Sequence, residues 1–432
     1  MKTIQSLINE FESGKNDHLL LDIYEDSHLI SGQSERYINL LKLFEKTYPQ
    51  KEVELYSAPG RSEVCGNHTD HQKGEVLATS INLDVIACVA PNSENIVRLL
   101  SDGNEIIVDL NKLEKEKGDE GTSLGLVKGM LFGLKEAGFK IGGFHACLTN
   151  DVIIGGGLSS SAAFETIIGT IISGLYNEMQ IDPVTIARVG QYAENIYFGK
   201  PCGLMDQMAC SVGGLIHIDF KDEKNPFVEK VDADFSKYGH SLCIVDTKGS
   251  HQDLTDDYAA VPAEMKMVAE YFGKKVLREV DENEFYKNIA HIRNTLNDRA
   301  VLRAMHFFAE EKRVEDIVRY MNAGDFSMFL KLINQSGHSS FQYLQNVYTN
   351  KDVKNQGVSI GLANGERLLQ GQGAIRVHGG GFAGTIQAFV PDDMVENFKT
   401  GMEAVFGPAS CHVLKIRKYG GIKLTGKEVE NK

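Results

Sequence analysis

One stretch of the chain, residues 152–163, constrains the fold more than any other. It reads Val-Ile-Ile-Gly-Gly-Gly-Leu-Ser-Ser-Ser-Ala-Ala, and its three glycines permit close backbone approach and positive φ angles. Apolar residues then recur from Phe164 to Leu175 at i, i+3, i+4, i+7, i+8 and i+11, which predicts a helix. Residues 144–148 before the loop have the character of a strand. The predicted order is therefore strand, glycine loop and helix N-terminus.

A loop of this kind is suited to an anion, because the first N–H groups of a helix are free and the helix dipole is positive there. A glycine-rich turn can also be purely structural, and that alternative stays open. The three serine hydroxyls of residues 159–161 favour phosphate binding. The run is not a Walker A loop, since no Lys-Ser or Lys-Thr pair closes it.

Composition excludes several classes of protein. The 432 residues are enough for about two or three domains, with 42% apolar and 24% charged residues as in ordinary globular proteins. A net charge of −14 disfavours nucleic acid and anionic membranes as partners. The seven cysteines form no Cys-x-x-Cys pair, which disfavours zinc knuckles and a disulfide framework. Without a signal peptide or an apolar run of ~18 residues, we expect a cytoplasmic location and no membrane contact.

The chain divides into three predicted segments. Residues 1–50 carry the pattern of two or three helices and are expected to form a helical N-terminal extension with a packing or interface role. Residues 51–230 are predicted to form an N-terminal lobe that contains the glycine loop. Residues 231–432 are predicted to form a C-terminal lobe, because a charged stretch near residues 220–237 marks a boundary.

A dense polar stretch, residues 58–74, lies between two predicted strands, Glu52–Ala58 and Val85–Ala90. One interpretation of this stretch is a solvated loop. A second is a metal site made of His68, Asp70 and His71, although the other histidines of the sequence show no matching cluster.

A helix is predicted to start at Asp182-Pro183, with Asp as the N-cap and Pro at the first helical position. It carries Glu194 and ends at Gly199-Lys200-Pro201. The string Gly-Leu-Met-Asp-Gln follows at residues 203–207, and its Asp206, taken alone, is typical of a cap or a turn.

A second glycine cluster, residues 379–384, lies between predicted strands at 374–378 and 385–390. Its glycines match a dinucleotide-binding pattern, but that pattern needs a helix after the glycines and here a strand follows. We therefore reject dinucleotide binding. Arg376, just before the cluster, is either a second cation of the site or a surface charge.

In these motifs the chain resembles the galactokinases, a family of GHMP kinases. The glycine–serine loop resembles their phosphate loop, with Val152 where a proline is common. Residues 60–74 resemble the signature Gly-Arg-Val-Asn-Leu-Ile-Gly-Glu-His-Thr-Asp-Tyr-Asn-x-Gly, and residues 203–207 match Gly-x-Met-Asp-Gln. Asp246-Thr247 with Tyr258 downstream, and the glycine cluster, are further matches.

The resemblance implies an α/β (α+β) fold of the two-lobed GHMP kinase type. Its N-terminal lobe would be ribosomal-protein-S5-like, its C-terminal lobe ferredoxin-like, and the active site would lie between them. The implied activity is ATP-dependent phosphorylation of the C1 hydroxyl of galactose, with ATP and Mg²⁺ as cofactors. The implied partners are only a small-molecule sugar and ATP, and we expect a monomer.

The resemblance also implies roles for individual residues. Asp206 would act as the base and Arg61 would keep it ionised. ATP phosphates would rest on the loop formed by Gly155, Gly156, Gly157, Leu158, Ser159, Ser160 and Ser161. Magnesium would bind a loop serine, Ser160 or Ser161, together with Glu194.

For the sugar, the resemblance implies contacts from five residues. Asp70 would accept hydrogen bonds from O3 and O4, Asn67 and His68 would lie near C6, Tyr258 would lie near the ring, and Gly203 would line the site.

Four residues depart from the signature: Ser62, Glu63, Asn67 and His71. Galactokinases carry glutamate where this chain has Asn67, and plant galacturonokinases have a non-acidic residue there and Asp-His-Gln after it. A kinase for galacturonate or another galactose-like sugar is therefore an alternative. A second hypothesis is that the carboxylate of Glu63, two residues from Arg61, replaces the missing one. A non-catalytic sugar and ATP sensor is a third, less favoured, because the loop serines, Arg61 and Asp206 are all present.

Overall fold

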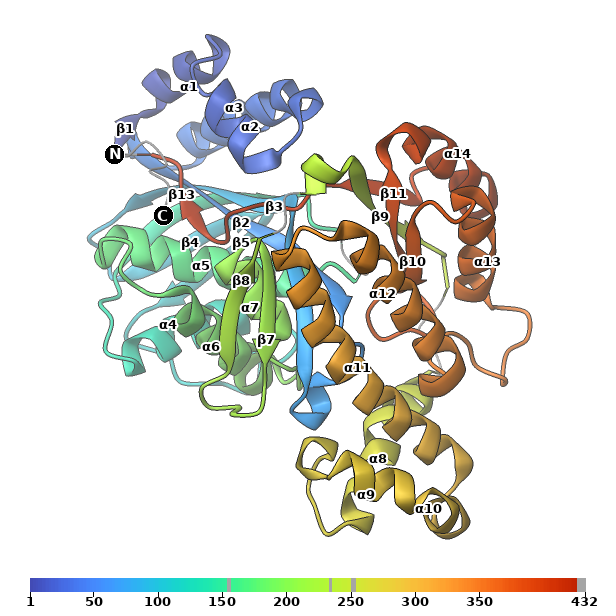
Figure 1. Cartoon of the computed structure of the whole chain (residues 1–432). Helices are drawn as coiled ribbons and strands as arrows, with labels where there is room; N and C mark the ends of the chain where they lie inside the picture. Colours follow the sequence, from blue (N-terminus) through green and yellow to red (C-terminus); the bar gives the residue numbers. More distant parts are fainter. Residues whose placement is uncertain (154–156, 233–234, 250–253, 426–432) are drawn as a thin grey trace.

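The computed structural model describes residues 1–153, 157–232, 235–249 and 254–425. These residues form two lobes, each built on its own sheet (Figure 1). The helical segment of residues 255–322 lies between and below them in that view, and residues 2–3 and 422–423, near the two ends of the chain, belong to the sheet of the first lobe.

The first lobe is built on a sheet that has nine strands among the described residues. Its main path runs β1-β2-β3-β6-β4-β5, with β13 on β2, β7 on β3 and β8 on β7. Only the β4–β6 pair is parallel in this part of the chain. The strands are β1 (Lys2–Thr3), β2 (Glu52–Cys65), β3 (Glu75–Pro91), β4 (Ile96–Ser101), β5 (Asn104–Asp109), β6 (Phe144–Asn150), β7 (Leu215–Asp219), β8 (Phe227–Val231) and β13 (Ile422–Lys423).

Helices cover both faces of this sheet (Figure 1). One face packs against α4 (Ser123–Glu136), α5 (Ser160–Tyr176), α6 (Pro183–Tyr192) and α7 (Met205–Val212). The other face carries α1 (Ile4–Glu12), α2 (Asp17–Tyr24) and α3 (Ile30–Thr47), which have a separate apolar core with that face. The N-terminal helices are thus a covering layer of the sheet.

A fully buried carboxylate, Asp84 on β3, fastens this layer to the sheet. Arg36 of α3 lies 2.6 Å from its Oδ1, and Arg417 lies 3.0 Å from its Oδ2. The hydroxyls of Tyr24 and Ser57 also donate to Oδ2, Tyr24 at 2.9 Å. Two cations and two hydroxyls therefore compensate one buried negative charge.

The second lobe is an antiparallel sheet of order β10-β11-β9-β12. Its strands are β9 (His240–Asp246), β10 (Ala374–Val377), β11 (Thr385–Pro391) and β12 (Cys411–Leu414). The apolar side chains of α12 pack with one face, and those of α13 and α14 with the other. The helices of this half are α8 (Thr255–Tyr271), α9 (Glu282–Lys287), α10 (Ile289–Thr295), α11 (Asp298–Asn322), α12 (Phe326–Ser339), α13 (Gly357–Leu369) and α14 (Val395–Phe406).

The structure confirms the helix predicted after the glycine loop, and residues 1–50 contain three α-helices where two or three were predicted. The strand predicted to end at Ala58 is wrong in extent, because β2 continues to Cys65. Two register shifts against β3, between Pro59 and Arg61 and between Glu63 and Cys65, let the strand bend and continue. Half of the polar stretch is therefore a strand rather than a loop.

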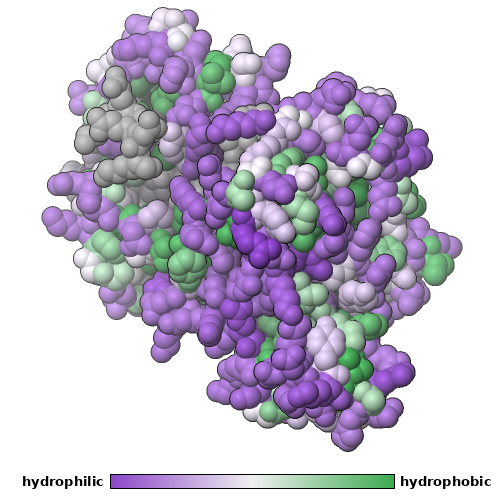
Figure 2. Space-filling model, viewed as in Figure 1, coloured by the Kyte–Doolittle hydropathy of each residue, from purple (hydrophilic) through white to green (hydrophobic). Residues whose placement is uncertain are grey.

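The division into consecutive lobes fails at the end of the chain, because β13 pairs with β2 of the first sheet. All seven cysteines are free, and six of them are buried. None of the helices among the described residues has the length and apolar character that a membrane crossing requires. The face in Figure 2 is largely hydrophilic, with apolar residues in small groups.

Candidate active site

The glycine–serine loop, predicted to bind phosphate, enters α5 in a strained conformation. Gly157 has φ +68° and Ser159 has φ 53°, and α5 starts at Ser160. The main chain is fixed to β2, because Leu158 O accepts a hydrogen bond from Arg61 N at 3.1 Å. A Cβ atom on Gly157 would lie 3.1 Å from Nδ1 of His378, so the second glycine cluster abuts the loop. The predicted ATP ligands Gly155 and Gly156 lie outside the described residues.

Arg61 and Asp206 face each other beside this loop. The guanidinium Nε donates to Oδ1 at 2.7 Å and Nη2 donates to Oδ2 at 2.6 Å. Arg61 also donates to the carbonyl of Gly157, and the hydroxyl of Ser159 donates to Asp206. Burial opposes ionisation of Asp206, but the Arg61 charge, the Arg61 hydrogen bonds and the Ser159 hydroxyl outweigh it and lower its pKa. The predicted base is therefore held as an anion.

Oxygen atoms suited to a divalent cation gather at the first turn of α5. Ser161 Oγ donates to Glu194 Oε1 at 3.2 Å, and Glu194 belongs to a π-helical turn, η3 (Ala193–Phe198), that extends α6. The other predicted serine, Ser160, accepts a hydrogen bond from Asn150 at 2.9 Å. Lys200 pairs with Glu194 at 3.0 Å and offsets its charge. This geometry brings Ser161 and Glu194 together, with Ser160 one residue away.

The amide of Gln207, next to the base, holds the buried side of Glu194. Its Nε2 donates to Glu194 Oε2 at 2.8 Å and to Glu165 Oε2 at 3.1 Å. Burial, and then the charge of Glu194, raise the pKa of Glu165 well above its ordinary value. Gln207, next to the predicted base, therefore orients the carboxylate of Glu194, the predicted magnesium ligand.

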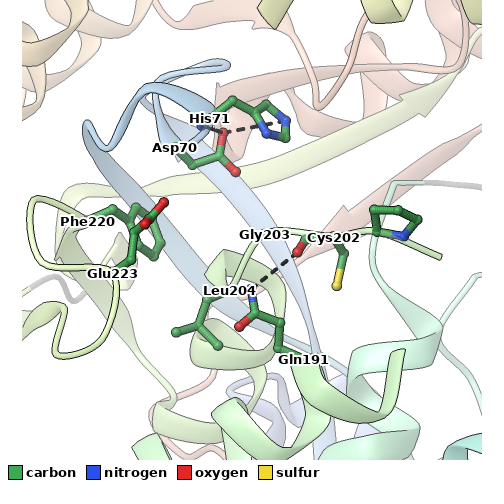
Figure 3. Close-up of a pocket in the computed structure, with 9 residues that line it drawn as sticks. Asp70, His71, Gln191, Cys202, Gly203, Leu204, Phe220 and Glu223 are labelled. Atoms are coloured by element: carbon green, nitrogen blue, oxygen red, sulfur yellow. Dashed lines mark hydrogen bonds and ion pairs between the residues drawn. The ribbon is translucent and has the colours of Figure 1, made fainter. Parts of the chain in front are cut away.

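Asp70 and Gly203 line a cleft of about 350 Å³. Figure 3 shows Asp70 and His71 on one side of it and Cys202, Gly203 and Leu204 on the other. A Cβ on Gly203 would lie 2.8 Å from Oδ2 of Asp70, so a side chain there would displace the carboxylate from its present position. Two predicted sugar contacts, far apart in sequence, thus meet at one opening.

The second glycine cluster lies over the signature residues. His68 Nε2 is 3.1 Å from the carbonyl of Gly380, and the Tyr258 hydroxyl donates to Gly381 O at 2.6 Å. Burial and the neighbouring His71 hold the pKa of His68 down to about 4, so its ring is neutral at pH 7. Burial also raises the pKa of Tyr258 to about 12. His68 and Tyr258 come from distant parts of the chain, and both contact the glycine turn at residues 380–381.

Asn67 differs from the other predicted sugar contacts, because its side chain is buried beneath the site. Its amide is hydrogen bonded to Glu63, to the carbonyl of Gly379 and to Asn346. Arg376 is likewise buried and forms an ion pair with Glu63 at 2.9 Å. The prediction that Arg376 could be a surface charge is therefore wrong.

The alternative metal site of His68, Asp70 and His71 receives no support. Within the described ranges, no group of three or more His, Cys, Asp or Glu side chains has the geometry to hold a metal ion. The ring Nε2 of His71 lies 3.9 Å from Oδ1 of Asp70.

Several residues of the site escaped the sequence analysis. His378 bridges the hydroxyls of Ser62 at 3.0 Å and Thr385 at 2.9 Å, and its pKa is lowered to about 3 by burial and by Arg61 and Arg376. The sequence did offer a signal for His378, because this residue directly precedes the second glycine cluster. The contact between Lys200 and Glu194 gave no sequence signal, because it depends on how η3 turns.

Two family models match the chain. The galactokinase galactose-binding signature matches residues 42–91, which include Arg61 and Asp70. The N-terminal domain of GHMP kinases matches residues 125–214, which include the phosphate loop and Asp206.

Curated proteins and solved structures show the same similarity. A galactokinase of Lactobacillus helveticus is 30% identical over 381 residues, which are 86% of this chain and 94% of that protein. The crystal structure of Lactococcus lactis galactokinase complexed with galactose matches with a TM-score of 0.74 and 26% identity, over 89% of this chain and 99% of that one. Methanococcus jannaschii mevalonate kinase, at 15% identity and a TM-score of 0.59, covers 85% of this chain and 99% of its own and shares the fold.

Proposed function

The chain belongs to the galactokinase family of GHMP kinases, and we propose that it transfers the terminal phosphate of ATP to the C1 hydroxyl of galactose. The observation that carries this proposal is the two-point Arg61–Asp206 pair beside the phosphate loop. Phosphoryl transfer depends mainly on positioning and on neutralising charge, and this pair supplies a base and a cation at one point.

In the proposed reaction Asp206 accepts the proton of the C1 hydroxyl as that oxygen attacks the terminal phosphorus. Its lowered pKa keeps it unprotonated at neutral pH, so it is ready to accept. Arg61 holds the carboxylate in one orientation and offers positive charge to the phosphate as it moves. The Ser159 hydroxyl, which donates to Asp206, links the base to the loop that holds ATP.

ATP use follows from membership of the kinase family, and the loop from Gly157 to Ser161 is its proposed binding site. Magnesium, when bound, would neutralise phosphate charge, and Ser161 and Glu194 fit it because two oxygen atoms converge there. Glu194→Gln should raise the magnesium concentration needed for half-maximal activity about tenfold, since it removes a charged ligand. An unchanged magnesium requirement would move the cation elsewhere.

The proposed sugar site is the cleft of Figure 3 and the turn above it. Asp70 would accept hydrogen bonds from O3 and O4, which favours the axial O4 of galactose. Gly203 leaves room for that carboxylate, and His68 and Tyr258 would contact the rest of the ring. A monomeric state and a cytoplasmic location remain predictions from the sequence.

The proposal is tested by ADP release with galactose, galacturonate, N-acetylgalactosamine and arabinose, measured side by side with the purified chain. We expect the highest kcat/KM with galactose. ADP release with galacturonate in preference to galactose would replace the substrate. Binding of galactose and ATP without ADP release would identify a sensor.

A further inference from the structure

Glu63 and Asn67 both depart from the family signature: position 63 gains a carboxylate and position 67 loses one. The signature has Asn and then Glu four residues later, whereas this chain has Glu63 and then Asn67. The amide and the carboxylate have therefore changed places. In the structure these two side chains contact each other directly, because Asn67 Nδ2 lies 3.0 Å from Glu63 Oε1.

The amide of Asn67 is fully occupied. Nδ2 donates to Glu63 and, at 2.7 Å, to the carbonyl of Gly379. Oδ1 accepts from Asn346 Nδ2 at 2.8 Å and from Ser340 Oγ at 3.4 Å. An amide has two donors and two acceptor lone pairs, and all four are used here. The side chain is also inaccessible to solvent, so it has nothing left to offer a sugar.

The carboxylate of Glu63 serves a second partner. Its Oε1 accepts from Arg376 Nη2 at 2.9 Å, and Arg376 Nη1 donates to the carbonyl of Val64 at 2.6 Å. Arg376 lies on β10, three residues before Gly379. Oε1 of Glu63 therefore binds one end of the segment 376–379 directly, through Arg376, and the other end through Asn67, which donates to Gly379 O. The three side chains connect β2 of the first lobe to the glycine turn of the second.

We propose that Glu63 and Asn67 form one positioning unit, in which carboxylate and amide are interchangeable only together, and that this unit holds the turn at residues 379–381 over the sugar. The turn carries the carbonyls that His68 and Tyr258 contact. Asn67 thus acts through the turn and touches no substrate. This inference rests on the proposed galactose phosphorylation.

Each single exchange breaks the unit in a different way. Asn67→Glu removes the donor and sets a second carboxylate against Glu63 and the carbonyl of Gly379, which are both acceptors. Glu63→Asn leaves the buried guanidinium of Arg376 without a carboxylate. In the double variant Glu63→Asn/Asn67→Glu, the amide at position 63 donates to the carboxylate at position 67 and one negative charge remains for Arg376. The repulsion between two carboxylates is thereby removed, while the hydrogen bond to Gly379 O stays lost.

The experiment is a double-mutant cycle on the full chain, with kcat and KM measured for galactose and ATP affinity measured by calorimetry. We expect each single variant to lose at least about tenfold in kcat/KM for galactose, mainly through KM. The double variant should lose at least about tenfold less than the product of the two single losses. ATP affinity should stay within about twofold, since the hydrogen bonds of Glu63 and Asn67 within the described part of the chain go to other segments than the phosphate loop.

A matched control exchanges the exposed Glu284 of α9 and the half-buried Asn288 directly after that helix, which have the same spacing. That exchange should leave KM unchanged. If a single variant fails to fold, Glu63→Gln is measured in its place. Glutamine keeps the shape and the acceptor of Glu63 but removes the charge, so the KM for galactose should rise.

Three results would overturn the inference. The first is additive losses in the cycle. The second is a lower melting temperature with unchanged KM, because a purely structural unit would behave in that way. The third is higher galactose activity in Asn67→Glu alone, which would make residue 67 a sugar contact. Absence of galactose turnover in the unsubstituted chain would instead count against the proposed function.

Discussion

Arg61 and Asp206 meet in a two-point ion pair across the junction of β2 and α7, with N–O distances of 2.7 and 2.6 Å. Such a fork fixes the orientation of a carboxylate as well as its charge. The pair also reaches the phosphate loop, because Arg61 donates to Gly157 O and Ser159 donates to Asp206. Loss of either partner should therefore affect proton transfer before it affects binding.

Asp206→Asn should lower kcat by roughly 10² or more, because an amide cannot accept the proton of the attacking hydroxyl. The amide keeps the size of the carboxylate and can still accept from Arg61, so ATP and galactose should bind with near-normal affinity. The measurements are steady-state kinetics and calorimetry with each ligand. Near-normal turnover in this variant would show that Asp206 is not the base.

Removal of Arg61 should shift the acidic limb of the pH–rate profile. The pKa of Asp206 is lowered because Arg61 outweighs the effect of burial, so activity should persist to pH values below the ordinary carboxylate range. In Arg61→Met only the weaker effects of the Ser159 hydroxyl and of Lys200 still oppose burial, and the limb should move upward by about one pH unit or more. Arg61→Lys keeps the positive charge and should move it less. A limb that stays in place in both variants would assign that titration to another group.

A side chain at Gly157 should abolish nucleotide binding without unfolding the chain. Gly157 has positive φ, and a Cβ there would lie 3.1 Å from His378 and 3.3 Å from Thr385, so Gly157→Asp displaces the loop and adds negative charge next to phosphate. Gly103→Asp is the control, since Gly103 also has positive φ but has open space around it. Unchanged ATP affinity in a folded Gly157→Asp variant would contradict the loop assignment.

Asp84→Asn should lower the free energy of unfolding by about 3–5 kcal/mol, because it leaves the buried guanidinium of Arg417 without a carboxylate and removes one of the two carboxylates, Asp84 and Asp151, that pair with Arg36. Burial opposes ionisation of Asp84, but Arg36 and Arg417 outweigh it and lower its pKa in the folded state. Its contribution is therefore present above the unfolded pKa, about 3.9, and is lost as pH falls through the folded value.

Urea unfolding at pH 7 and at acidic pH tests this, with Asp102→Asn in an exposed turn as the control. The difference in stability between the unsubstituted chain and Asp84→Asn should shrink as the pH falls. A difference that stays constant with pH would mean that Asp84 stabilises the fold by packing rather than by charge.

Local patterns predicted the elements that frame the site. The helix after the glycine loop and the cap at Asp182 follow from nearest-neighbour preferences, and the structure confirms both, since Asp182 accepts from Thr185 N at 2.9 Å. The extent of β2 was not predictable in this way, because its polar end becomes strand only through pairing with β3. Pairing of β13 with β2 joins segments at opposite ends of the chain and left no local trace.

Asn67 shows which property of the site could not be predicted from the sequence, namely whether a polar side chain faces the ligand or is buried beneath it. Its residue type allowed either a sugar contact or a structural role. The choice is made by Gly379 and Asn346, which are 312 and 279 residues away. Arg376 was ambiguous for the same reason, because only its contact with Glu63 shows that it is buried and paired.

The most direct test of the central claim is to follow ADP and product when the chain is supplied with ATP and either galactose or 1-deoxygalactose. The account predicts equal amounts of ADP and galactose 1-phosphate from galactose, identified by phosphorus NMR, and no ADP above background from 1-deoxygalactose. ADP release with 1-deoxygalactose, or phosphate on any hydroxyl of galactose other than C1, would contradict it.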